Sequence, residues 1–140
     1  MLKILHDEKI KTIVWFTPIL PFINDTKDNL IKILDYCSYA KVYGIIFFDF
    51  GLTLREENRE YFYEQLDKEF SGIKELYIKE FKDNYFVSSK NAKCLYNILK
   101  MECKKRNIIL DNEKLFEEMY TYESKNTFFK NKVIFNIKNN

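Results

Sequence analysis

Two unbroken runs of apolar residues stand out in the first third of the chain. Residues 10–19 read IKTIVWFTPI, and residues 42–50 read VYGIIFFDF. Continuous rather than alternating hydrophobicity is typical of strands that are buried on both faces, as in a parallel sheet. Between the two runs, residues 30–40 carry apolar side chains at helical spacing, and residues 24–26 (Asn-Asp-Thr) can cap that helix. The pattern predicts a strand, a crossover helix and a second strand, which together form a right-handed βαβ unit.

After Gly51 the apolar positions follow the period of surface helices, with a break at residues 83–91. Outside the βαβ unit, helices are predicted at residues 1–9, 55–70, 73–81 and 92–106. Asp111 is expected to cap a last helix. From residue 127 the tail alternates loosely, which predicts a strand or an arm docked on a neighbour.

The composition indicates a packed globular body without a strong overall charge. The 140 residues are 46% apolar and 17% aromatic, and 23 basic against 21 acidic residues leave a net charge of +2. So small a net charge gives no electrostatic reason to expect a nucleic-acid or membrane partner. No apolar stretch reaches about 18 residues, so no membrane span is expected. The start, MLKILHDEKI, lacks the apolar region of a secretory leader, and a reduced, cytoplasmic protein is expected.

Two parallel strands with one crossover helix cannot form a stable sheet alone. Both edges and at least one face of such a sheet stay open. The pattern therefore predicts either a partner that supplies another sheet or a chain that is the end of something larger.

Several short motifs resemble, in their order and spacing, the C-terminal part of radical S-adenosylmethionine proteins, specifically the spore photoproduct lyase-like family. The segments that carry the similarity are P-x-x-P-x-x-N-D at residues 18–25, G-L-T-L-R at 51–55, N-R-E-Y-F-Y at 58–63, S-G-I-K-E-L-Y at 71–77 and N-Y-F-V-S-S-K-N at 84–91. Each motif is weak alone, and the ordered set, which covers roughly residues 2–107, is more specific.

The resemblance implies an α/β fold in which the chain supplies only part of a barrel. Residues 1–52 would form the last two βα units of a partial (β/α)6 TIM-like barrel, and residues 53–140 a helical C-terminal extension. The first four strands would be missing, which explains the open edge. The chain is then expected to be a C-terminal fragment, cut for crystallisation or encoded by a truncated gene. The expected partners are the missing N-terminal part of the barrel and a second copy, which pairs through the open strand edges with a swapped arm from residues 127–140.

The resemblance also implies chemistry that this chain cannot perform alone. A parent enzyme would use a [4Fe–4S] cluster, held by a C-x-x-x-C-x-x-C loop, to cleave S-adenosylmethionine reductively to a deoxyadenosyl radical. The three cysteines, Cys37, Cys94 and Cys103, are too far apart to form that loop. We therefore expect no catalytic residue, no metal ligand, no cofactor of its own and no activity in isolation.

The ends of the last strands would line the cofactor, because barrel folds bind ligands at the carboxyl ends of their strands. The expected cofactor-proximal residues are Thr17, Pro18, Ile19, Phe48 and Asp49. Two of them have a structural alternative. Pro18, with Pro21, can simply end the strand and stiffen the loop. The Asp49 carboxylate can accept hydrogen bonds from loop amides near Gly51.

Other polar residues are open to both a functional and a structural interpretation. Arg55 and Arg59 could bind a phosphate or a carboxylate, although pairing with neighbouring glutamates on a solvated helix face is favoured. His6 is the only histidine and is expected at the surface. Residues 100–106 (KMECKKR) could touch nucleic acid, and a solvated helix face is again favoured. The alternatives to a radical-enzyme fragment are a stand-alone module that pairs with a partner's sheet and, below it, a weak nucleic-acid-binding module.

Overall fold

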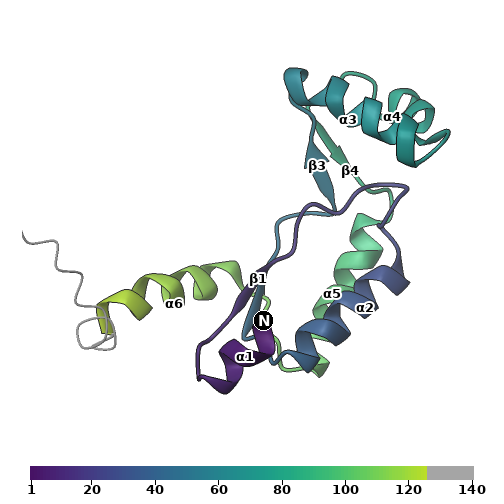
Figure 1. The fold of residues 1–140 in the computed structure, drawn as a ribbon. Coiled ribbons are helices and arrows are strands. Elements are labelled where there is room, and N and C mark those ends of the chain that lie inside the picture. Colours follow the sequence, from purple (N-terminus) through teal and green to yellow (C-terminus); the bar gives the residue numbers. More distant parts are fainter. Residues whose placement is uncertain (126–140) are drawn as a thin grey trace, which may run out of the picture.

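A parallel pair of short strands lies at the centre of the first part of the molecule (Figure 1). In the computed structural model, which describes residues 1–125, β1 (Ile13–Trp15) pairs with β2 (Gly44–Ile46). Helix α2 (Lys27–Tyr39) connects the two strands, and Thr26 caps it by accepting a hydrogen bond from the Asn29 amide. The predicted βαβ unit is therefore confirmed, with strands shorter than the apolar runs that predicted them.

A third segment extends the sheet on the far side of β2. The Ile45 amide donates to the Ile109 carbonyl (2.8 Å), and the Ile109 amide donates to the Tyr43 carbonyl (3.1 Å). This parallel bridge follows helix α5 (Ala92–Lys105), so a second helix also crosses from one strand to the next. The sheet order is β1, β2 and then the segment around Ile109, which the sequence pattern did not predict.

Helices α2 and α5 pack against each other on one face of this sheet (Figure 1). Both contribute buried side chains to a single core with the strand residues that face them. The members of this core include Leu30, Leu34 and Cys37 of α2, Leu95, Leu99 and Cys103 of α5, and Phe16, Ile45, Phe47 and Ile108 of the sheet segments. The two crossover helices therefore cover the same face.

Helix α6 (Asn112–Lys125) begins against the opposite face. The Leu115 side chain is fully buried there, and it lies where a Cβ on Gly44 would come within 2.3 Å of it. Phe116 contacts the ring of Trp15, with centroids 6.3 Å apart. Asp111 caps α6 as predicted, because its carboxylate accepts a hydrogen bond from the Lys114 amide (3.1 Å). The short helix α1 (Leu2–Asp7) precedes β1.

Residues 51–88 form a second unit with a hydrophobic core of its own, which we call the α3–α4 unit. Strands β3 (Gly51–Thr53) and β4 (Phe86–Ser88) pair antiparallel at its base, and helices α3 (Glu56–Glu69) and α4 (Ile73–Phe81) lie between them in sequence (Figure 1). The core residues are Leu54, Leu66, Tyr77, Phe81 and Val87. Gly51 is required where the strands meet, because a Cβ would come within 2.1 Å of the Val87 carbonyl oxygen.

The division predicted between residues 52 and 53 differs from the observed one. Helix α5 and Ile108 complete the core that β1, β2 and α2 form. The α3–α4 unit is therefore an insertion between β2 and α5. The predicted helices at residues 1–9, 55–70, 73–81 and 92–106 are confirmed to within a few residues, whereas β3 and β4 were not predicted. The predicted arm at residues 127–140 lies outside the described residues. In the part of the chain that the structure describes, no helix is long and apolar enough to cross a membrane.

Candidate functional site

The carboxyl ends of the parallel strands define one edge of the sheet, which is where open α/β sheets bind their ligands. Three segments leave the sheet at this edge: residues 16–26 after β1, residues 47–50 after β2 and residues 111–113 after the third segment. We call residues 16–26 the rim loop. The segment after β2 is held by the Asn112 side chain, whose amide donates to the Phe47 carbonyl (2.7 Å) and accepts from the Phe47 amide (3.1 Å).

Two adjacent concavities lie at this edge. The first, of about 350 Å³, is lined by residues 47–50 together with Ala92, Lys93 and Tyr96 of α5. The second, of about 290 Å³, shares Phe47 and Tyr96 and continues to residues 110–113. The rings of Phe47 and Tyr96 stack between them, with centroids 5.9 Å apart. An aromatic surface flanked by one cation and several carboxylates is therefore available to a ligand.

A larger concavity, of about 560 Å³, lies near the amino ends of the strands and includes His6, Lys9, Lys11, Lys41 and Tyr43. Lys9 and Lys41 each follow the end of a helix, α1 and α2, where a cation is favoured by the helix dipole. Their presence has a structural explanation, and we place the candidate site at the carboxyl ends instead.

The five residues expected near a cofactor do not come together. Phe48 is 59% exposed and contacts the Trp15 ring, and with Asp49 it lines the first concavity. Thr17 and Pro18, joined by a cis peptide bond, are exposed on the rim loop but do not line that concavity. Ile19 is 5% exposed and belongs to the hydrophobic core, so its side chain is not presented at the rim.

The Asp49 carboxylate accepts a local amide hydrogen bond, as its structural interpretation predicted. Its Oδ1 accepts a hydrogen bond from the Phe50 amide (2.7 Å), which is the local amide contact expected for a carboxylate at the end of a buried strand. The carboxylate is half-buried and still lines the first concavity. It is therefore oriented by the backbone and remains accessible to a ligand.

The rim loop is shaped by its own polar residues. Asn24 accepts a hydrogen bond from the Leu20 amide through Oδ1 (2.6 Å), and the amides of Ile23 and Asn24 both donate to the Leu20 carbonyl (3.2 and 3.1 Å). The Asn24 carbonyl in turn accepts from the side-chain amide of Asn29 in α2 (2.9 Å). Asn24 therefore joins the loop to the helix that follows it.

Two residues from outside the loop also hold it. The Tyr77 hydroxyl, which is buried, donates to the Pro21 carbonyl (3.0 Å). The Ser89 hydroxyl donates to the Asp25 carboxylate (2.5 Å) and accepts from the Asn91 amide (3.0 Å). Burial raises the pKa of Tyr77, and the nearby Asp25 carboxylate adds to this, so the hydroxyl stays protonated and remains a donor.

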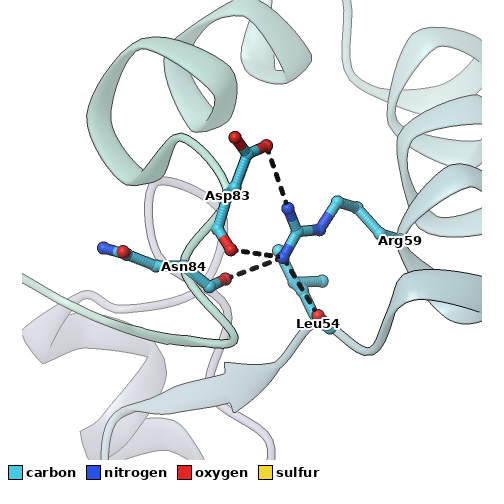
Figure 2. A network of polar contacts seen from close by, with 4 residues as sticks. All are labelled: Leu54, Arg59, Asp83 and Asn84. Atoms are coloured by element: carbon cyan, nitrogen blue, oxygen red, sulfur yellow. Dashed lines mark hydrogen bonds and ion pairs between the residues drawn. The ribbon is translucent and has the colours of Figure 1, made fainter.

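Arg59 takes a role that neither interpretation of the sequence predicted. Its Nη2 donates to the carbonyls of Leu54 (3.2 Å), Asp83 (3.0 Å) and Asn84 (2.9 Å), as Figure 2 shows. Its Nη1 lies 3.4 Å from the Asp83 carboxylate, which is fully exposed. Arg59 thus connects the end of β3 to the loop before β4 inside the α3–α4 unit. Arg55 makes one exposed contact, from Nε to the Tyr85 hydroxyl (3.3 Å).

The cysteines do not provide the ligands of an iron–sulfur cluster. Cys37 and Cys103 are buried between α2 and α5, and burial raises the pKa of both thiols, that of Cys103 to about 11. Cys94 is exposed on α5. Within residues 1–125, no group of three or more His, Cys, Asp or Glu side chains is arranged to hold a metal ion. A [4Fe–4S] cluster therefore does not fit on the described residues.

The basic run at residues 100–106 is partly neutralised. Arg106 pairs with Asp35 of α2 (2.6 Å) and with Glu102, one turn earlier on α5. Together the two contacts hold the Arg106 side chain, which is 14% exposed, between the two helices. The residue fastens α5 to α2 and is not a free cation for nucleic acid.

The sheet, the rim loop and the α3–α4 unit together define the class of fold: a parallel α/β sheet with an inserted helical unit that is fastened to the edge where the strands have their carboxyl ends. Comparison with known proteins finds no relative, since no family model, no curated protein and no solved structure matches the chain.

Proposed function

We propose that this chain is the carboxyl-terminal part of a radical S-adenosylmethionine protein that resembles the spore photoproduct lyase-like family. The observation that carries the proposal is the convergence of the motif residues in space. Pro21 and Asp25 of the first motif contact Tyr77 and Ser89 of two later ones, and Arg59 of another braces the unit that supplies Tyr77. A chance similarity between short motifs gives no reason for their members to bind one another.

The arrangement of the sheet supports the same proposal. The chain moves in one direction from β1 to β2 to the segment around Ile109, and both crossover helices lie on one face. Crossover helices that lie on one face are typical of barrels, whereas the crossover helices of doubly wound sheets lie on both faces because their strand order reverses. Helix α6, which lies against the opposite face, follows the third segment and is not one of the two crossover helices. No strand within residues 1–125 pairs with the outer edge of β1. Further strands added there would continue the winding toward a barrel.

The chain's share of the chemistry would be limited to shaping a ligand pocket. In radical proteins of this kind, a [4Fe–4S] cluster and S-adenosylmethionine together supply the deoxyadenosyl radical. The cluster does not fit on the cysteines of this chain, so its ligands would come from polypeptide outside these 140 residues. In this proposal the rings of Phe48 and Tyr96 give a ligand an apolar surface, and Asp49 and Lys93 flank it with opposite charges.

The test is a reconstitution with iron and sulfide, followed by reduction in the presence of S-adenosylmethionine. We expect no 5′-deoxyadenosine from the 140-residue chain alone, and turnover after it is combined with a polypeptide that carries C-x-x-x-C-x-x-C. Turnover by the chain alone would contradict the proposal. In the assembled protein, Phe48→Ala should weaken S-adenosylmethionine binding. The matched control is Tyr61→Ala, which removes a similarly exposed ring (66%, against 59% for Phe48) from α3.

A second candidate is an interaction module that adds its strands to another sheet, and the open outer edge of β1 favours it. An unpaired strand edge can also be covered by a second copy of the chain. Sedimentation velocity at micromolar concentration distinguishes the outcomes: self-association supports pairing between copies, and a clean monomer contradicts it.

A further inference from the structure

The rim loop is held from the side by the α3–α4 unit, a part of the chain that contributes no strand to the parallel sheet. Tyr77 is 0% exposed, and its hydroxyl reaches across to the Pro21 carbonyl (3.0 Å). The Phe22 ring packs edge-on against Tyr77 (centroids 5.7 Å apart) and also contacts Phe81 (5.9 Å). The unit therefore binds the middle of the loop by a buried hydrogen bond and an aromatic cluster.

The backbone of the loop needs this support. The backbone of Phe22 has a φ of 64°, in the left-handed region that residues other than glycine rarely adopt. Such a conformation persists only where the surrounding structure determines it. Here the surrounding structure is the pair of rings from α4, since Phe22 packs on both.

A second attachment lies where the chain leaves the α3–α4 unit. Ser89, directly after β4, donates through its hydroxyl to Asp25 of the rim loop (2.5 Å). Its backbone amide donates to the carbonyl of Phe50 (2.7 Å), in the segment that follows β2. One buried residue thus ties together the segments that leave both strands at the candidate site.

We propose that the α3–α4 unit is the positioning element of the candidate site, and that Tyr77 of this unit and Ser89, which directly follows it, are the positioning residues. While the unit is docked, the rim loop keeps the one conformation seen here, and a displacement of the unit releases the loop. Any effect of this release on a bound S-adenosylmethionine rests on the proposed function, whereas the control of the rim loop by the α3–α4 unit does not.

The test compares hydrogen exchange in the full chain and in Tyr77→Phe, which removes only the hydroxyl donor. The reporters are the amides of Leu20, Ile23 and Asn24, all of which donate hydrogen bonds inside the rim loop. We expect these amides to exchange about tenfold faster, the effect of losing one buried hydrogen bond, while the amides of α2 and α5 keep their rates.

Tyr63→Phe is the matched control, because Tyr63 lies in the same core and its buried hydroxyl has no hydrogen-bond partner among the described residues. It should leave the exchange of the rim loop unchanged. Equal exchange in Tyr77→Phe and the unaltered chain would overturn the proposal. So would an acceleration spread evenly over α2, α5 and the rim loop, because that pattern reports a general loss of stability.

Ser89→Ala provides an independent arm, with Ser88→Ala as its neighbouring control, since the Ser88 hydroxyl makes only a long contact with the Phe50 carbonyl (3.4 Å). Faster exchange at Asn24 in the first variant but not in the second supports the proposal, and equal exchange in the two variants contradicts it. Neither arm requires a cluster or S-adenosylmethionine. A failure here therefore leaves the proposed function standing, and a failure to form deoxyadenosine leaves this inference standing.

Discussion

Replacing Arg59 by methionine is the most informative single change in the α3–α4 unit. Methionine keeps an apolar stem of similar length, so the packing of that stem is largely retained while the guanidinium donors are lost. The guanidinium serves three carbonyls, those of Leu54, Asp83 and Asn84, at 2.9 to 3.2 Å (Figure 2). These carbonyls come from the end of β3 and the loop before β4, so their separation would open the base of the unit.

The size of the effect follows from these contacts. The ion pair with Asp83 contributes little, because that carboxylate is fully exposed to solvent. A hydrogen bond from a charged donor contributes about 1.5–3 kcal/mol, and the single Nη2 shares its two protons among the three carbonyls. We therefore expect Arg59→Met to lower the free energy of unfolding by about 2–4 kcal/mol. For a chain of this size, that loss lowers the midpoint of thermal unfolding by roughly 5 to 15 °C.

Thermal and urea unfolding followed by circular dichroism measure this effect. Arg55→Met is the control, because Arg55 makes one exposed contact with Tyr85, and its replacement should change stability by less than about 0.5 kcal/mol. Arg59→Lys should recover only a small part of the loss, since an ammonium cannot reproduce the planar fork of donors. An Arg59→Met variant that unfolds within about 1 °C of the unaltered chain, or an equal loss in Arg55→Met, would refute this reasoning.

Three further predictions concern the parallel sheet and the helices that pack against it. Gly44→Ala should displace α6, because a Cβ there meets the tips of the Leu115 side chain at 2.3 and 2.9 Å, and fluorescence of the single tryptophan should shift as its neighbour on α6 moves. Of the three thiols, Cys94 should react rapidly with a thiol reagent and Cys37 and Cys103 only on unfolding, with titration under native and denaturing conditions as the measurement. Because Cys103 has a folded pKa of about 11 against 9.0 unfolded, stability should fall as the pH rises from 9 to 11, and urea midpoints across that range would show it.

The sequence could predict the βαβ unit because its signals are local and strong. Each strand lies in a long apolar run, and α2 carries a cap and an apolar stripe. The apolar runs nevertheless predicted longer strands than the structure contains. After Phe16 the chain reaches Pro18, which has no amide to donate to a neighbour, and the ladder with β2 ends with the bond from Phe16 to Ile46.

The segments that were missed are short and depend on distant partners. The strand around Ile109 follows α5 directly and makes only two ladder bonds with the segment that contains β2. Strands β3 and β4 have three residues each, and exposed side chains such as Thr53 and Phe86 gave no alternating pattern. A boundary placed where helices begin after Gly51 therefore separated α5 from the sheet that it covers.

Near the candidate site, the motifs did not indicate which contacts their residues make. Asp25, Tyr77 and Arg59 all lie in the motifs that support the resemblance, and each binds a backbone or side-chain group of the protein itself. Such roles depend on which segments meet in space, which spacing along one chain does not reveal. Ile19, expected at the rim, is 5% exposed and belongs to the hydrophobic core instead.

The DNA sequence immediately upstream of the Met1 codon shows directly whether the chain derives from a radical S-adenosylmethionine enzyme. We predict an open reading frame, continuous with this one or in a neighbouring gene, that encodes C-x-x-x-C-x-x-C within about 200 residues, the length needed for the remaining barrel units. A stop codon and a ribosome-binding site directly before Met1, with no such motif encoded beside it, would contradict a radical-enzyme origin and favour the interaction module.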